Sequence, residues 1–273
     1  MNLSHVRSGA LLAACVAGLA SRAAAQATRG PELIFTIGVG EASGGHLWTV
    51  DPQLADAVRG PDTVALSRRL LRPSLVAAFG AQLYLSPHFG YTLEATFLGL
   101  ATESQCTAAS FSLDAQHANQ QACTVIQNQH IFTNAVALQG GLTARTTLGR
   151  GAQGYLRAVG GVALLGGSFV TTGGPILVSD TTGSWISTRL FLSDQSARTL
   201  TWVATLGGGL TMALGPSYNV RVEMGEVFIA LPVPTGPADV ASTVAPVRWR
   251  TFHLPSLTLG LDVLLERRSG RRY

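Results

Sequence analysis

The feature that most constrains the fold is an alternation of apolar residues with small or polar residues, repeated in eight segments. From Phe89 to Phe97 the odd-numbered residues are apolar or aromatic, and the even-numbered residues up to Thr96 are glycine, threonine or glutamate. This period of two is the pattern of a β-strand with one apolar face. The regular segments are 75–85, 89–100, 200–214 and 257–265; less regular ones lie at 32–40, 130–146, 155–170 and 218–230. Most exceed the usual strand of about 5–6 residues and match the roughly 9–11 residues of a tilted membrane-crossing strand.

The connections between these segments alternate in length. The short ones are rich in Gly and Pro and fall at 86–88, 148–154 and 215–217. The long ones are 41–73, 103–129, 173–198 and 231–247. An even number of strands with short turns at one end and long loops at the other predicts an all-β fold, an eight-stranded antiparallel up-and-down transmembrane β-barrel. The alternative is ten strands, with residues 173–198 supplying the extra pair instead of a hairpin above the membrane.

The composition agrees with a barrel that faces lipid. Only 12% of the 273 residues are charged, 47% are hydrophobic and 31 are glycine. Disordered chains are charged and poor in apolar residues, so disorder is excluded. The net charge of +4 arises from few acids and not from a basic patch, so we expect no nucleic-acid partner.

The N-terminal segment predicts export. Residues 1–25 combine Arg7, an apolar run from Gly9 to Ala20 and alanines before Gln26, as a secretory signal peptide does. The barrel domain is then 26–273. Two other interpretations are a short membrane anchor and a lipoprotein signal ending at Cys15.

Aromatic residues separate by position relative to the turns. Tyrosines lie beside the short turns and tryptophans at the opposite strand ends, which predicts two girdles at the membrane–water interfaces. The alternative is the aromatic core of a soluble β-sandwich. The expected interface residues are Tyr84, Tyr91, Tyr155, Tyr218, Trp202 and Trp249.

Taken together, residues 31–273 resemble the small outer-membrane β-barrels of the OmpA/OmpX type, and the hairpin of residues 83–91 is their most typical stretch. The resemblance implies the bacterial outer membrane, with its lipid, lipopolysaccharide and the barrel-assembly machinery as partners. One departure concerns the C-terminus. Members usually end on an aromatic residue of the last strand, whereas here residues 266–272 separate that strand from Tyr273.

Six charged residues fall on the faces expected to line the lumen: Glu94, Arg145, Arg157, Arg221, Glu223 and Asp262. Unpaired charges are costly to bury, and eight strands leave an interior that side chains fill. We therefore expect an arginine–carboxylate network that plugs the barrel. The alternative is a narrow gated pore lined by these charges.

Two cysteines, Cys106 and Cys123, remain after the signal, and an even number in an exported chain predicts a disulfide. The alternative is two free thiols. No cluster with metal-ligand spacing accompanies them, so we expect no metal site and no cofactor.

No sequence motif indicates catalysis. The remaining enzymatic possibility is a lipid-modifying enzyme at the outer rim, with His117 or His130 acting beside Ser110 or Ser112 and Asp114. We expect these to be loop residues in water.

The long loops are the expected place of function. In 103–129, Asn119–Gln121 fits an exposed tip. In 41–73, four arginines either engage lipopolysaccharide phosphates or form a solvated rim: Arg59, Arg68, Arg69 and Arg72. The expected function is a structural or surface-interaction role without an open pore, toward an unidentified extracellular ligand. The alternatives are a narrow channel for small solutes and the lipid-modifying enzyme.

Overall fold

The computed structural model describes residues 31–55, 62–71, 73–110, 118–127, 129–149, 151–180, 183–195, 199–239 and 242–265. The side chains of residues 108–110, 179 and 180 are excepted. The proposed signal peptide and the C-terminal tail lie outside these residues. Within them, no helix is long and apolar enough to cross a membrane.

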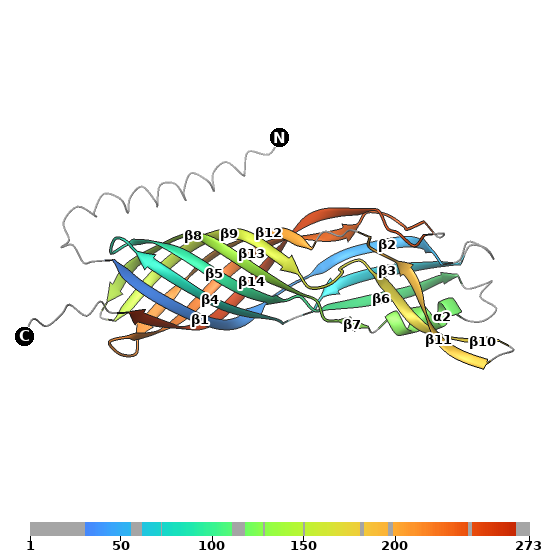
Figure 1. Cartoon of the computed structure of the whole chain (residues 1–273), viewed down its shortest axis with the longest axis horizontal. Coiled ribbons are helices and arrows are strands. Elements are labelled where there is room, and N and C mark those ends of the chain that lie inside the picture. The colour runs from blue at the N-terminus through green and yellow to red at the C-terminus, as the bar shows by residue number, and fades with distance from the viewer. Residues whose placement is uncertain are drawn as a thin grey trace, which may run out of the picture.

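Eight strands close into an antiparallel barrel in which chain neighbours are also spatial neighbours (Figure 1). The strands are β1 (Glu32–Ala42), β4 (Ser74–Tyr84), β5 (Phe89–Gly99), β8 (Asn134–Gly149), β9 (Ala152–Leu165), β12 (Leu200–Ala213), β13 (Tyr218–Pro234) and β14 (Val247–Leu265). The pairing of β1 with β14, from Leu33 opposite Leu265 to Ala42 opposite Ser256, closes the wall. The predicted eight-stranded up-and-down barrel is confirmed, and the ten-stranded alternative is wrong.

The two ends of the barrel differ. Three tight connections, β4–β5, β8–β9 and β12–β13, lie at the end where β1 begins and β14 finishes, which we call the turn end. The opposite, loop end carries further secondary structure. It comprises β2 (His46–Leu54), β3 (Thr63–Leu70), β6 (Thr102–Ser110), α2 (Ala118–Ile126), β7 (His130–Ile131), β10 (Thr172–Asp180) and β11 (Gly183–Leu192).

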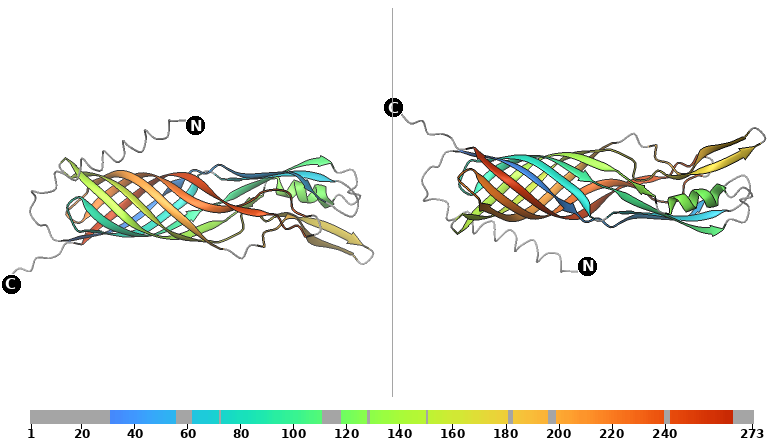
Figure 2. Two further views of the ribbon diagram at one scale, coloured as in Figure 1. Left: turned by 90° about the horizontal axis from the view of Figure 1, so that it is seen from above. Right: turned by 90° about the horizontal axis from the view of Figure 1, so that it is seen from below.

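At the loop end, half of the barrel wall continues upward as an open sheet. The sheet order β2-β3-β6-β7 repeats the barrel order β1-β4-β5-β8, and each barrel strand is joined to its upper counterpart by only a few residues. The upper parts of β13 and β14 stay paired from Val227 opposite Leu254 to Pro234 opposite Val247. Helix α2 packs between this sheet and the β10–β11 hairpin (Figure 2). We call this region the loop-end domain.

Several expected loops are therefore regular structure. Residues 41–73 and 103–129 contain β2, β3, β6 and α2 instead of irregular loop. Residues 231–247 are another expected loop, but β13 continues into them as far as Pro234. Strand β14 starts at Val247 and not at 257. The apolar alternation ends where the strands leave the lipid-facing belt, but the backbone pairing does not. Residues 173–198 contain the separate β10–β11 hairpin.

The outer wall of the barrel carries a continuous apolar belt. Its side chains are about half exposed and include Ile37, Leu75, Leu93, Leu142, Leu206 and Leu259. On β14 the belt runs from Leu257 to Leu265, about 26 Å along the strand and about 20 Å along the axis at a tilt of ~40°. This height is close to the roughly 25 Å apolar band of membrane barrels.

Candidate functional site

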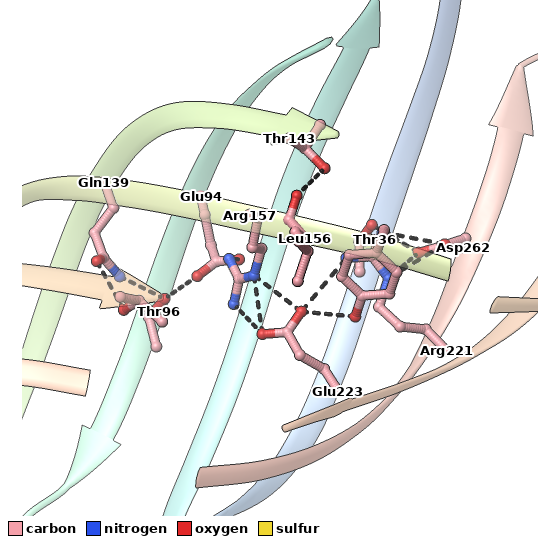
Figure 3. Close-up of polar contacts among 12 residues, drawn as sticks. Thr36, Glu94, Thr96, Gln139, Thr143, Leu156, Arg157, Arg221, Glu223 and Asp262 are labelled. Carbon is pink, nitrogen blue, oxygen red and sulfur yellow. Dashed lines mark hydrogen bonds and ion pairs between the residues drawn. The ribbon is translucent and has the colours of Figure 1, made fainter. Parts of the chain in front are cut away.

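The polar centre of the lumen is built around Arg157 on β9. Its Nη1 donates to Glu94 Oε2 at 2.5 Å, and its Nη2 lies 2.7 Å from Glu223 Oε1. Arg157 Nε donates to the Glu223 carboxylate as well, at 2.9 Å. Tyr155 donates its hydroxyl to Glu223 Oε2 at 2.7 Å. Thr96 donates to Glu94 Oε1 at 2.8 Å, and Figure 3 shows this contact beside Arg157. Alternation places these groups inside because strand residues two apart share a face.

A second ion pair lies toward the turn end. Arg221 Nε on β13 is 3.1 Å from Asp262 Oδ1 on β14, and Thr36 on β1 donates to the same oxygen at 2.8 Å. Arg221 Nη1 is 3.8 Å from Glu223 Oε2, which joins this pair to the Arg157 cluster. Since every carboxylate has an arginine and a hydroxyl beside it, burial leaves none of these charges unpaired.

Arg145 lies nearer the turn end than the other lumen arginines. It pairs with Glu32 at 2.5 Å, donates to Pro87 O at 3.0 Å and covers the ring of Tyr84 at 3.7 Å. Glu32 is a partner that the sequence analysis missed. The sequence indicates it, because Glu32 lies four residues before the inward-facing Thr36 on β1, and residues an even number apart share a face.

The lumen has room for this network because glycine replaces a side chain at Gly207. A Cβ there would lie 2.6 Å from Glu223 Oε1 and 3.4 Å from Arg157 Nε. A cavity at the turn end, lined by Tyr84, Tyr155 and Arg221 among others, is only about 10 Å³. That is about the volume of a single water probe, so side chains fill this part of the lumen.

Above the charges the lumen becomes apolar. Leu98, Ile229 and Leu254 point inward and are at most 2% exposed. They belong to one hydrophobic core that continues into the loop-end domain through Leu66, Trp48, Phe169 and Ile126. The barrel and the loop-end domain therefore share a core.

Two of the expected interface tyrosines face the lumen instead of lipid. Tyr84 and Tyr155 are 3% and 5% exposed, and both line the turn-end cavity. Their positions along the strands explain this, because residues two apart face the same side of a strand. Tyr84 lies two residues after the inward Gln82, and Tyr155 lies two residues before the inward Arg157. Both expectations were wrong for this reason.

The other expected interface aromatics divide as well. Tyr91, Tyr218 and Trp202 lie on the outer wall and are about half exposed. Trp249 lies on the part of β14 above the belt, opposite Pro232, and packs against the shared core. It is therefore not part of a lipid-facing girdle.

The arginine group of 41–73 is not one cluster. Arg68 is 1% exposed and lies over the Trp48 ring; it donates to Ser168 O at 3.4 Å and to Thr171 O at 2.8 Å. Burial lowers the pKa of Arg68 to about 10, which leaves it charged at neutral pH. Arg69 is exposed and pairs with Glu103 at 2.7 Å. Arg59 and Arg72 lie outside the described residues, so the described pair alone does not form the expected phosphate site.

The loop-end domain is held together by covalent and polar contacts. A disulfide joins Cys106 on β6 to Cys123 on α2. Asn119 is buried on α2 and does not lie at an exposed tip. Among the described residues, no group of three or more His, Cys, Asp or Glu side chains could hold a metal ion. Of the rim-enzyme candidates, His130 is on β7, and the side chains of Ser110, Ser112, Asp114 and His117 lie outside the described part.

Comparison with known proteins adds three similar folds. No protein-family model and no curated protein matches the sequence. Neisserial surface protein A is 9% identical, with a TM-score of 0.36, over 87% of this chain and 99% of that chain. Ail of Yersinia pestis, solved with the heparin analogue sucrose octasulfate, is 10% identical, with a TM-score of 0.38, over 87% of this chain and 100% of that chain. The outer membrane protein AlkL, solved in lipid bilayers, is 10% identical, with a TM-score of 0.37, over 91% and 96%.

Similarity at this level concerns the fold alone. The closed antiparallel barrel itself, with an apolar outer wall and a polar lumen, carries the classification. The chain has the fold of a small eight-stranded outer-membrane β-barrel.

Proposed function

We propose that this protein spans a bacterial outer membrane, with its turn end in the periplasm, and acts through its loop-end domain at the cell surface without conducting through its lumen. The observation that carries the proposal is the filled lumen. Arginine–carboxylate pairs occupy the turn-end half, and an apolar core continuous with the loop-end domain occupies the other half. A solute would have to displace both.

Two further observations support this location. The height of the apolar belt is close to that of the apolar band of membrane barrels, and one disulfide joins two elements of the loop-end domain. Disulfides persist in oxidising compartments such as the periplasm and the cell surface. Outer-membrane lipid and the barrel-assembly machinery are then the partners that such a protein needs to reach its membrane.

The outward face of the β2-β3-β6-β7 sheet is the surface that we assign to a ligand. His46, Arg69, Glu103 and His130 are directly opposite one another across the four strands, so their side chains form one row. Ser67 and Gln105 lie on the same face and are hydrogen-bonded to each other at 3.4 Å. This polar face, supported by the shared core behind it, suits a polar extracellular ligand better than an apolar one.

Cysteine labelling of intact cells tests the orientation. Ile186 at the tip of β11 and Leu214 beside the β12–β13 turn are both well exposed, so each accepts a cysteine. A membrane-impermeant maleimide should label Ile186→Cys on intact cells, but Leu214→Cys only after the outer membrane is opened. The reverse pattern, or equal labelling of both, would contradict the proposal.

A gel of the membrane fraction, with and without boiling, provides the control for folding. A closed barrel keeps its structure in SDS until heated, so its mobility should change only in the boiled sample. A protein that is soluble in the periplasm and shows no mobility change would exclude a membrane barrel.

A further inference from the structure

One carboxylate lies on the lipid-facing wall. Glu41, on β1, is exposed and is directly opposite Leu257 on β14 and Leu75 on β4. These leucines are 48% and 58% exposed on the belt, and Met224 continues the same row on β13. Glu41 therefore occupies one position in a row of apolar side chains. In the part of the chain that the structure describes, no hydrogen bond or ion pair reaches its carboxylate.

Glu226, a second carboxylate on the outer face near the loop end, offers a contrast. On β13 it lies 3.4 Å from His253 Nδ1, and that histidine packs edge-on against Phe228. Glu226 thus has a partner, whereas among the described residues Glu41 has none. Since the belt on β14 ends at Leu257, directly opposite Glu41, this carboxylate lies at the loop-end edge of the belt, where the apolar wall meets the lipid head groups.

A groove of about 560 Å³ begins at Glu41. It crosses the outer wall between two rows of the belt and is lined by apolar side chains that include Val39, Val222, Leu257 and Leu259. Pro73 and Ser74 line its loop-end side, and Thr258 lies between Leu257 and Leu259. Glu41 is the one charged residue in this lining. The volume is within the roughly 300–1,000 Å³ of small-molecule sites.

The close approach of β1 to β14 shapes this part of the wall. A Cβ at Gly40 would lie 2.1 Å from Leu257 O and 2.6 Å from Thr258 Cα. Glycine therefore permits the two strands to approach each other beside Glu41, which itself lines the groove.

We propose that this groove binds an amphiphile with one alkyl chain and a protonated amine head. The alkyl chain lies along Val39, Leu257 and Leu259, and the ammonium donates to the Glu41 carboxylate. A hydrogen bond between an ammonium and a carboxylate is charge-assisted, and beside the apolar wall it is less screened than in water. Sulfate and phosphate heads are repelled by the same charge. The site is on the outer wall and is separate from the surface face proposed above.

The test uses the folded full-length barrel in phosphatidylcholine nanodiscs at neutral pH. Dodecylammonium is titrated while the methyl resonances of Val39, Leu75 and Leu257 are followed by NMR. We expect saturable shifts confined to these groups, with Leu138 and Leu206 elsewhere on the belt unaffected. Dodecanol and dodecyl sulfate, which carry the same chain, should bind at least tenfold more weakly.

Two variants separate the carboxylate from nonspecific partitioning. Glu41→Gln keeps the size of the side chain and should weaken dodecylammonium binding at least tenfold, to the affinity of dodecanol. Glu226→Gln removes a rim carboxylate outside the groove and should leave binding unchanged. Heat-dependent gel mobility confirms that both variants fold.

Three outcomes would overturn the inference. They are unchanged binding by Glu41→Gln, equal binding of all three head groups, and shifts spread evenly around the belt. Absence of saturable binding to the native protein would overturn it as well. None of these outcomes depends on whether the loop-end domain binds a surface ligand, so this site and the proposed function can fail separately.

Discussion

The two halves of the lumen are filled by opposite kinds of chemistry. Toward the turn end, Arg157 and Arg221 hold Glu94, Glu223 and Asp262 through hydrogen-bonded ion pairs. Toward the loop end, side chains such as Leu98 and Ile229 form an apolar core. The boundary follows the connections of the strands. Where the wall continues into a further sheet, the lumen has a second layer to pack against, and apolar side chains fill it. At the turn end the described residues form only short turns, and paired charges fill the space.

The comparison is tested most strongly by Arg157→Ala. Two buried carboxylates then lose their shared cation, and breaking a buried pair in this way costs about 3–5 kcal/mol. We expect the free energy of unfolding in urea, measured with lipid vesicles present, to fall by about 4 kcal/mol. Arg157→Lys should recover part of the loss, since it keeps the charge but not the forked geometry. A loss below about 1 kcal/mol for Arg157→Ala would mean that the network does not stabilise the barrel.

The apolar half is tested by Leu98→Ala. Leu98 is 1% exposed, and truncating a buried leucine costs about 3–4 kcal/mol through lost transfer free energy and a remaining cavity. Because the core is shared, hydrogen exchange should also increase in β3 and β6 of the loop-end domain. Faster exchange restricted to the barrel strands would show that the two parts have separate cores.

The contribution of the disulfide is tested by replacing both cysteines with serine. The bond closes a segment of 17 residues, for which loop entropy predicts about 3 kcal/mol. The loss should be confined to the loop-end domain, seen as faster proteolysis near α2. The heat-dependent gel mobility of the barrel should not change, and a variant that no longer shows it would contradict this separation.

The smallest effect is expected at an exposed pair. Arg69 is 57% exposed and pairs with Glu103 at 2.7 Å, the same kind of contact as Arg157 makes in the lumen. Water and salt screen it, so Arg69→Ala should cost less than about 1 kcal/mol in the same urea experiment. A loss equal to that of Arg157→Ala would show that burial does not explain the difference.

Alternation in the sequence predicted the barrel, because a lipid-facing wall requires an apolar side chain at every second position. It also predicted that Glu94, Arg157, Arg221 and Glu223 share the lumen. The same alternation also places Tyr84 and Tyr155 inside, because each lies two residues from an inward-facing side chain. Proximity to a turn does not distinguish the two faces of a strand, so it predicted the wrong face for both tyrosines.

The loop-end domain was not predictable in the same way. Above the belt the apolar alternation is interrupted. On β3 the buried face of Val64, Leu66 and Leu70 includes Arg68, and β2 has register shifts between His46 and Trp48 and between Val50 and Gln53. Burial of Arg68 depends on carbonyl groups about 100 residues away in the chain, at Ser168 and Thr171. Such long-range contacts leave no local signal, and a cluster of arginines in sequence was therefore not a cluster in space.

Single-channel recording tests the closed lumen most directly. Purified, refolded protein is inserted into a planar lipid bilayer, with insertion verified by the heat-dependent mobility of the same sample. A lumen filled by paired charges at one half and by a shared apolar core at the other predicts no stepwise conductance, for the native protein and for Arg69→Ala alike. Reproducible conductance steps from the native protein would contradict the account and favour a narrow channel.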